Sequence, residues 1–433
     1  MEKPSLADRL IAPLTLLERS RGWKRRGLVF LYALIALIVG VLGWRELSLW
    51  RLPNAPEPFD LVRFGRVEVA DADNAMVAYR PIFAKFGNLA PRSNQAGDKA
   101  WEVSDWSAAD PEVRRWAEDH RDALTAWLPA NDRTDSLLVQ PEDLTMSTIL
   151  EPAQNLRSYV RLAFLEGSRL EQSGDLAGAW SMYRGGLRAS RHAGRHGGAI
   201  QRLIGNALLR KARVRVDAWA ENPGVSTELL RQAITDVEEC MAMTPPASEM
   251  VRAEYFSARD SLIRPESWRS MEEWSRESET EWINQIEVVR WGRRFLKHEP
   301  ERSLRVLRLI TAGYLAQCDR RSMLRPRLLA SQWMIYDHDS RTPPSVRSIS
   351  PQALEAWAKD SALLYIGPFN STLQGHFDAE PGIFDHFRLR MAERAFEIEH
   401  GRPPKTYGEL LGPYLKTLPE GIEPGDPANP SPG

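Results

Sequence analysis

Residues 162–187 read LAFLEGSRLEQSGDLAGAWSMYRGGL, and this stretch decides the predicted fold class. Apolar residues recur at helical spacing on both sides of Ser173-Gly174, where the pattern is interrupted. We therefore predict one helix that ends at Gln172 and a second that starts at Leu176. Small residues let two such antiparallel helices approach closely, and an aromatic ring fills the groove between them. The residues of these types are Gly167, Gly174, Ala179, Gly186 and Tyr183.

This hairpin resembles one tetratricopeptide repeat, in which small residues and an aromatic occupy equivalent positions. It departs from the repeat at Glu166, where the repeat prefers leucine, and no proline closes its second helix. No second match follows one repeat length further on, and a stable array needs at least about three repeats. The resemblance implies an irregular, tetratricopeptide-like bundle of diverged helix pairs. An ordinary helix–turn–helix accounts for the hairpin equally well.

Helical periodicity continues on both sides of the hairpin, and N-cap residues, glycines and prolines divide it into segments. No array of alternating strands is present, so we predict an all-α fold. The predicted helices begin after Asn74 and after Asp110, and then cover about 155–172, 176–193, 199–220, 226–243, 248–262, parts of 265–320, a segment after Ser350, and 385–400.

Composition excludes some classes of protein. The 433 residues, 43% apolar and 27% charged, are typical of a folded chain of two or three domains. The net charge of -1 argues against nucleic-acid binding, which needs a basic excess. Cys240 and Cys318 are too few for a disulfide scaffold or a zinc site. The sequence leaves open a single bridge between them.

Leu28 to Trp44, LVFLYALIALIVGVLGW, contains no charged residue and is long enough to span a bilayer. Cations are dense before this run, whereas only Arg45 and Arg51 follow it closely. The positive-inside rule therefore puts the N-terminus in the cytoplasm and the main body on the periplasmic side of the cytoplasmic membrane. The run is long for a signal peptide and no A-x-A site follows. We expect an uncleaved single-pass signal anchor, with cleavage as the alternative.

These signals divide the chain into six regions. The tail GIEPGDPANPSPG has the proline and glycine density of a disordered end. We expect a cytoplasmic basic arm at 1–26, a transmembrane anchor at 27–45 that meets lipid through 28–44, a partly helical exported region at 46–154, tetratricopeptide-like hairpins at 155–264, a C-terminal helical region at 265–420 and a disordered tail at 421–433.

Residues 399–420, EHGRPPKTYGELLGPYLKTLPE, resemble the C-terminal string of bacterial pseudopilins. The N-terminal signature of that family is absent. Pro13 stands where the processing glycine is required, and Glu18 is followed by RSRGWKRRG instead of an apolar helix. A buried glutamate of that kind needs continuous apolar helix around it. We therefore reject a pilin subunit.

The same string has a physical interpretation. Gly401 ends a long helix, and Pro403-Pro404 prevents it from resuming. Thr406 with Glu409 predicts a capping box for a short helix. The apolar residues that we expect to hold the chain against the body are Tyr414, Leu415 and Leu418.

The chain as a whole resembles a family of uncharacterised bacterial single-pass membrane-anchored proteins. The shared elements are N-A-x-x-x-Y at Asn74, Ala75 and Tyr79, G-D-x-x-G-A-W at 174–180, and the pseudopilin-like C-terminal string. The resemblance implies an anchor and a helical body. It implies no activity and no cofactor.

Candidate chemistry is sparse, because nucleophile elbows, phosphate loops and H-E-x-x-H are all absent from the sequence. His192 and His196 are four apart on one helical face and are the metal candidates. Two histidines do not complete a site, and cationic side chains at a helix C-terminus already stabilise the dipole. Asp337 and His338 in YDHDS are the catalytic candidates, because carboxylates orient a histidine as a base. An ordinary polar loop explains them as well.

The sequence supports two hypotheses about function. The first is a membrane-anchored interaction or scaffolding module that binds a protein or peptide in an apolar helical groove, without cofactor or nucleic acid. The alternative is an anchored envelope hydrolase that uses Asp337 and His338, or the cluster around His376 and His386. The hydrolase requires at least two of these groups to converge in one cleft.

Overall fold

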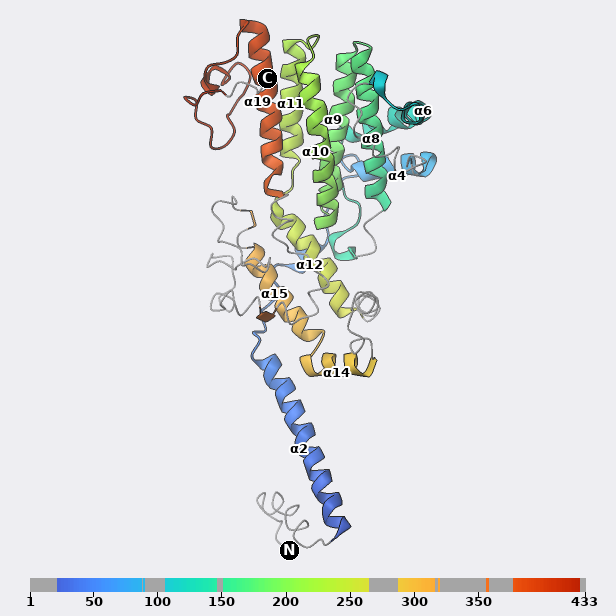
Figure 1. The fold of residues 1–433 in the computed structure, drawn as a ribbon, viewed down its shortest axis with the longest axis vertical. Helices are drawn as coiled ribbons and strands as arrows, with labels where there is room; N and C mark the ends of the chain where they lie inside the picture. Colours follow the sequence, from blue (N-terminus) through green and yellow to red (C-terminus); the bar gives the residue numbers. More distant parts are fainter. Residues whose placement is uncertain are drawn as a thin grey trace.

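The computed structural model of the chain describes residues 22–87, 89, 106–145, 151–264, 287–315, 318–319, 356–357 and 377–428. Within these residues the secondary structure is helical, and strand pairing is limited to isolated bridges such as Asn74 with Asp135. The prediction of an all-α fold is confirmed for this part of the chain. Figure 1 shows an elongated molecule with a single long helix at one end and a row of helices at the other.

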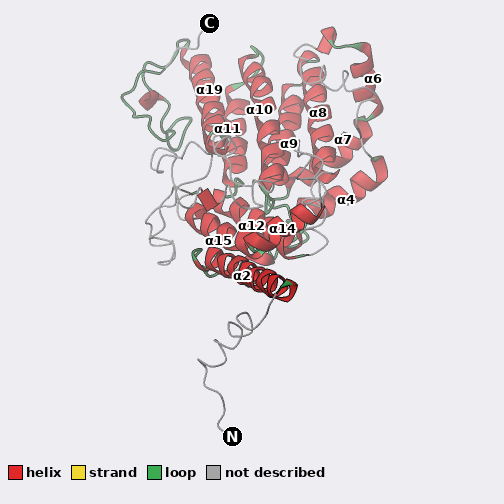
Figure 2. Cartoon of the chain, turned by 60° about the horizontal axis from the view of Figure 1, so that its bottom comes forward, coloured by secondary structure: helices red, strands yellow, loops and turns green. Residues whose placement is uncertain are grey.

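The long helix is α2 (Trp23–Trp50), which contains the apolar run and has no buried residue. It projects away from the rest of the chain (Figures 1 and 2). The helix continues to Trp50, beyond the predicted end of the anchor at residue 45. RELSLW contains no proline or glycine, and the first helix-breaking residue is Pro53. The transmembrane prediction is therefore confirmed only as one long apolar N-terminal helix.

Five helices stand side by side at the far end of the molecule (Figures 1 and 2). Within this row α8 packs on α9, α9 on α10, and α19 on both α10 and α11. The helices are α8 (Glu151–Gln172), α9 (Leu176–Gly194), α10 (Ala199–Glu221), α11 (Thr227–Ala242) and α19 (Glu380–His400).

Two of these helices start earlier than predicted. The sequence interpretation placed the starts near Asn155 and Asp385, after Pro152 and Pro381. Both prolines lie in the first turn of the helix, where the fixed φ of proline is suitable and no intrahelical N–H is required. The predicted ends of α9 and α10 agree with the structure to within one residue.

The hairpin of α8 and α9 is held by two contacts between a glycine and an aromatic ring. A Cβ atom at Gly167 would overlap the ring of Tyr183, and one at Gly186 would overlap the ring of Phe164. The turn between the helices has Gly174 at φ 83°, a left-handed value that glycine adopts without strain. The small residues identified in the sequence therefore determine how closely the two helices approach.

The contact between α9 and α10 is equally close. The rings of Trp180 and Trp219 stack with centroids 4.7 Å apart. Each indole also has a partner, since Trp180 Nε1 donates to Asp236 Oδ2 at 2.7 Å and Trp219 Nε1 donates to the Leu176 carbonyl at 3.0 Å. These rings belong to the distal core, whose largest buried members include Tyr79, Trp127, Tyr159, Tyr183, Trp219 and Phe387.

Short helices from the N-terminal part of the body pack against the rest of it. They contribute Tyr79 and Trp127 to the distal core. Asp110 caps its helix as predicted, its carboxylate accepting from the Glu112 N–H at 2.9 Å. The elements are α3 (Leu61–Gly65), α4 (Ala75–Phe86), η1 (Trp106–Ala108), α6 (Pro111–Asp119), α7 (Arg121–Trp127), η2 (Leu128–Asp132) and η3 (Pro141–Asp143). Of these, η1, α6 and α7 contact α8, η2 contacts α9, and η3 contacts α12 (Ala247–Ile263).

A second, proximal core lies next to α2. Its helices are α12 (Ala247–Ile263) and α15 (Glu301–Leu315), and α14 (Glu287–Lys297) lies against α2. Leu52, directly after α2, is 2% exposed within this core. The Arg305 guanidinium donates to the carbonyls of Leu49 and Leu52 at 3.3 and 3.2 Å. The end of α2 is therefore fastened to the body. The proximal core includes Leu52, Ala55, Tyr255, Leu262, Val306, Leu309 and Ile310.

The two cysteines are both free and buried, Cys240 in the distal core and Cys318 in the proximal core. The structure therefore does not form the bridge that the sequence left open.

The C-terminal segment folds back onto the body after Gly401, whose left-handed φ of 68° ends α19. Tyr414 and Leu415 are buried against the distal core, as predicted. The capping box is wrong, because the Thr406 side chain makes no cap hydrogen bond before η7 (Tyr407–Glu409). The Glu409 carboxylate accepts from the Lys405 N–H at 2.5 Å and from Arg402 Nη2 at 2.7 Å.

Residues 421–428 correct the prediction of a disordered tail. The Pro424 carbonyl accepts from the Gly408 N–H at 2.8 Å, and the Lys405 carbonyl accepts from the Ala428 N–H at 3.2 Å. Ile422 also packs against the distal core. Glycine and proline here form a rigid loop, because their turns are held by these hydrogen bonds. Residues 429–433 lie outside the described residues.

We predict that Gly186→Ala destabilises the protein by roughly 1–3 kcal/mol, because the new methyl group overlaps the buried Phe164 ring. Gly382→Ala is the matched control, since a Cβ there meets nothing within 4 Å. Urea unfolding of the detergent-solubilised chain, followed by helical circular dichroism, measures both. Equal stability of the two variants would contradict the glycine–ring contact.

Candidate functional site

Polar groups concentrate where the C-terminal half of α9 meets the connector that follows η2. This half of α9 is buried although it carries arginines and a histidine. Arg188 Nε donates to the Asn131 carbonyl of η2 at 2.6 Å, and its Nη2 donates to the Arg133 carbonyl of the connector at 3.2 Å. The connector has no regular secondary structure of its own, so α9 supplies donors to its backbone carbonyls.

His192 lies inside this region with both ring nitrogens engaged. Nε2 lies 2.9 Å from the Arg133 carbonyl, and Nδ1 lies 2.8 Å from the Tyr79 hydroxyl. The Tyr79 hydroxyl oxygen also lies 2.7 Å from Asn131 Oδ1. Burial lowers the pKa of His192 to about 4, so the ring is neutral at pH 7. The N-A-x-x-x-Y element therefore meets α9 through Tyr79.

His196 lies one turn further along, in a separate network. Nε2 is 2.9 Å from Asp135 Oδ1, and Nδ1 is 3.1 Å from Glu249 Oε1. Burial alone would lower the pKa of His196, but hydrogen bonds to these two carboxylates outweigh it and raise the pKa to about 9. Burial alone would likewise raise the pKa of Asp135, and its hydrogen bond to His196 lowers it overall. His196 is therefore charged at pH 7.

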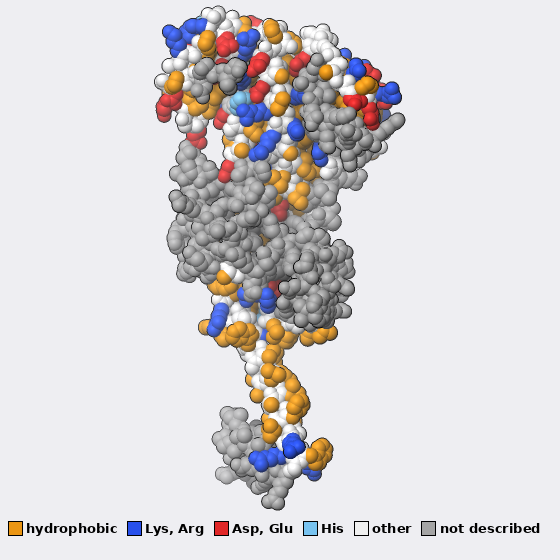
Figure 3. Space-filling view, in the orientation of Figure 1, with side chains coloured by type: hydrophobic (Ala, Val, Ile, Leu, Met, Phe, Trp, Pro, Cys, Tyr) orange, Lys and Arg blue, Asp and Glu red, His pale blue; other side chains and the backbone are white. Residues whose placement is uncertain are grey.

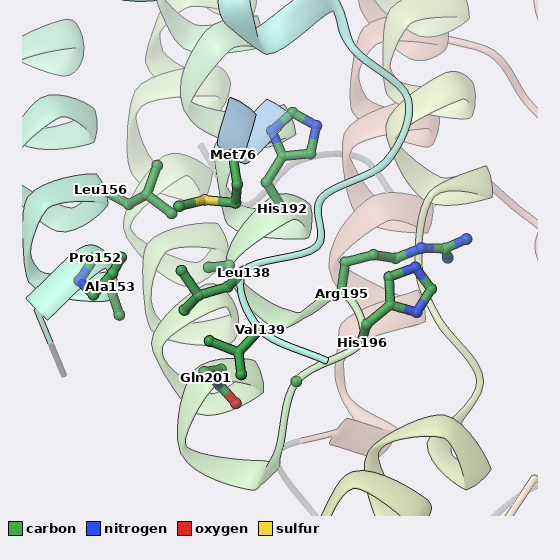
Figure 4. A pocket seen from close by; sticks show the side chains of 12 residues that line it. Met76, Leu138, Val139, Pro152, Ala153, Leu156, His192, Arg195, His196 and Gln201 are labelled. Atoms are coloured by element: carbon green, nitrogen blue, oxygen red, sulfur yellow. The ribbon is translucent and has the colours of Figure 1, made fainter. Parts of the chain in front are cut away.

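The two histidines do not form a metal site in the part of the chain that the structure describes. Each of their ring nitrogens has a protein partner, and no group of three or more His, Cys, Asp or Glu side chains there is arranged to hold a metal ion. Figure 4 shows the rings pointing in different directions, with His196 beside Arg195 and His192 near Met76. The cavity that both line has a volume of about 10 Å³, which is room for one water molecule at most.

A larger opening lies on the surface beside these networks, between α9, α11 and the connector. We call it the arginine groove, and its volume is about 650 Å³. Most of its lining residues are charged, which differs from the apolar groove expected from the sequence. The lining residues are Asp132, Thr134, Arg184, Arg188, Arg195, Glu239, Ala242 and Met243.

The arginines of the groove are held in place by acceptors on both sides. Arg184 Nη1 donates to Asp132 Oδ1 at 2.7 Å, and Arg195 Nη1 donates to the Met243 carbonyl at 3.3 Å. The sequence interpretation missed these residues. The available signal was the spacing of four between Arg184 and Arg188, which puts both on one face of a helix.

The proposed catalytic residues are not brought together among the described residues. Asp337, His338 and His376 lie outside them. His386 faces Asp217 of α10, with Nε2 3.0 Å from Oδ1. Asp385, one residue earlier, pairs instead with Arg388 at 3.0 Å.

Glu380, between His376 and His386 in the sequence, points into the protein. Its carboxylate is 1% exposed, 3.0 Å from Arg202 Nη2 and 3.5 Å from Arg191 Nη1. This buried ion cluster joins α9, α10 and α19. Sequence reasoning had no signal for it, because the partners lie far apart along the chain.

No protein-family model, curated protein or solved structure matches this chain.

We predict a pH signature for His196. Its pKa is about 9 in the folded protein against 6.5 when unfolded, so its stabilisation is complete below pH 6.5 and is lost as pH rises toward 9. The loss amounts to at most roughly 3 kcal/mol. His196→Asn, which tolerates the left-handed φ of 53°, removes this slope. Urea unfolding at a series of pH values checks it, and parallel profiles for the two proteins would refute the ion network.

His192 is predicted to destabilise the native state as the pH falls, whereas His196 does so as the pH rises. Its pKa is about 4 in the folded protein, so the unfolded chain binds a proton first as pH falls below 6.5. Native stability then decreases between pH 6.5 and 4, again by at most roughly 3 kcal/mol. The His192→Gln variant should be less stable than the wild type at pH 7, but its free energy of unfolding should change less between pH 6.5 and 4. A variant whose acid profile remains parallel to the wild type would show that His192 is not buried in its neutral form.

Proposed function

We propose that this protein is a membrane-anchored interaction module that binds a polypeptide segment in the arginine groove. The groove is the observation that carries the proposal. Its volume of about 650 Å³ lies in the usual range for ligand sites, about 300–1,000 Å³. It lies on the row of helices, near the C-terminal ends of α9 and α11.

The chemistry of the groove favours a segment rich in hydrogen-bond acceptors. A guanidinium has five N–H donors, and Arg195 uses Nε on Asp135 and Nη1 on Met243. Fixed arginine side chains match backbone carbonyls and carboxylates, because their donors are already oriented. The partner that we propose is therefore a loop or extended peptide with exposed carbonyls or acidic side chains.

Anchoring is supported by α2. Its 28 residues would measure about 42 Å, longer than the ~30 Å hydrocarbon core of a bilayer. None of them is buried by the rest of the chain, so their apolar side chains lack any other cover. The cations before the apolar run support a cytoplasmic N-terminus and a body on the opposite side.

Nothing in the described part of the chain favours the hydrolase. Glu380, Asp385 and His386 face different partners, and Asp337, His338 and His376 lie outside the described residues.

Site-specific photocross-linking in native membranes tests the groove. A photoreactive phenylalanine analogue at Thr134 or Ala242, both exposed groove residues, should yield the same discrete adduct. The control position is Val214, 65% exposed on α10 and not part of the groove lining. Arg184→Gln should reduce the adduct about tenfold or more if the arginine binds acceptors of the partner. Adducts at Val214 of equal yield, or insensitivity to Arg184→Gln, would refute the groove as the binding site.

A further inference from the structure

The helix α14 has apolar side chains that stay exposed in the part of the chain that the structure describes. Val288 is 75% exposed, Trp291 62% and Leu296 39%. The sequence EVVRWGRRFLK also has arginine or lysine at 290, 293, 294 and 297. At 100° per residue the apolar positions 288, 289, 291, 295 and 296 fall within one side of a helical wheel, and these four cationic positions fall on the other side. Such a pattern is typical of a helix that lies in a membrane interface.

Contacts place α14 beside one end of α2. Arg45 Nε donates to the Phe295 carbonyl at 2.7 Å, and the Arg45 guanidinium lies 4.5 Å above the Phe295 ring. One residue further along α2, Glu46 Oε1 lies 3.1 Å from His298 Nε2. Residues far apart in the sequence therefore bring α14 to the level of Arg45.

Two tryptophans of α2 indicate where Arg45 lies relative to the bilayer. Trp23 and Trp44 of α2 are 82% and 64% exposed. Their separation of 21 residues corresponds to about 32 Å of helix, close to the ~30 Å hydrocarbon thickness. Tryptophan is enriched at both membrane–water interfaces. Arg45 directly follows Trp44, so α14 lies at the level of the second interface.

We propose that α14 lies on the bilayer and inserts Val288 and Trp291 among the lipid headgroups, next to the point where α2 leaves the membrane. This inference rests on the proposed insertion of α2. Lipid is the occupant because the exposed apolar side of α14 continues the apolar surface of α2. Figure 3 shows hydrophobic side chains along the edge of the body where α2 joins it, and Trp50 there is 81% exposed.

The consequence is that the protein meets the bilayer at two places, α2 across it and α14 along it. A single helix leaves the body free to rotate and tilt relative to the membrane. A second contact, tied to α2 through Arg45, restricts both motions and orients the proximal core.

The test uses the full chain in vesicles of phosphatidylcholine with phosphatidylglycerol. A cysteine at position 291 or 288 (Trp291→Cys, Val288→Cys) is labelled with an environment-sensitive fluorophore, and the chain without an added cysteine measures labelling of the buried native thiols. Spin-labelled phosphatidylcholine in both leaflets, with its nitroxide near the headgroup, is the quencher. Leu37→Cys on α2, 63% exposed, reports anchoring, and Val214→Cys on α10, 65% exposed, is the matched control.

We expect quenching at 288 and 291 to exceed that at 214 by about threefold or more, together with quenching at 37. Quenching at 37 without quenching at 288 and 291 would overturn the role of α14 and retain the anchor. A fluorophore at 291 shielded from water but not quenched by lipid would indicate a protein partner and also overturn it. Equal quenching at 214 would mean that the whole body contacts lipid, which contradicts a specific role for α14. Absence of quenching at 37 would overturn the anchor itself, and this inference with it.

Discussion

The arrangement of the helix row depends on one buried ion cluster. Glu380 faces Arg202 and Arg191 with almost no exposure to solvent, and it is the group that joins the start of α19 to α9 and α10. Burial lowers the pKa of Arg191, and the attraction of Glu380 opposes this effect. A buried carboxylate between two guanidinium groups tolerates little displacement, because losing either partner leaves an uncompensated charge. It therefore restricts where α19, and the segment that follows it, can lie.

Contacts in the proximal core fix the position of α2 relative to the body. Arg305 binds the carbonyls at the end of α2, and Arg308 Nη2 donates to Glu57 at 2.9 Å. Leu52 and Ala55 then bury the chain between α2 and the body. The orientation of α2 is in this way transmitted to α15 and α12, and through α12 to α10. If α2 and α14 are held by lipid as proposed, the position of the arginine groove relative to the membrane follows from these contacts.

The sequence predicted those parts of the fold that depend on neighbouring residues. The boundaries of α9 and α10 follow from local caps and periodicity, and the glycines of the α8–α9 hairpin meet the aromatic rings. Errors arose where one residue type has two uses. The prolines of the predicted connector include Pro152, which lies in the first turn of α8. Glycine and proline in 421–428 form hydrogen-bonded turns, which composition does not distinguish from disorder.

The candidate site was less predictable, because it consists of long-range pairs. His192 and His196 look equivalent in the sequence, yet one is held neutral by Tyr79 and Arg133 and the other is charged between Asp135 and Glu249. By itself, the sequence determined the apolar helix, the helical class and the close hairpin, since these depend on side-chain size and polarity along a local repeat. Only the tertiary structure decided the charge states of the histidines, the arginine groove and the position of α14 beside Arg45. Those features depend on which distant groups share a low-dielectric interior or a common surface, and no spacing along the chain specifies that.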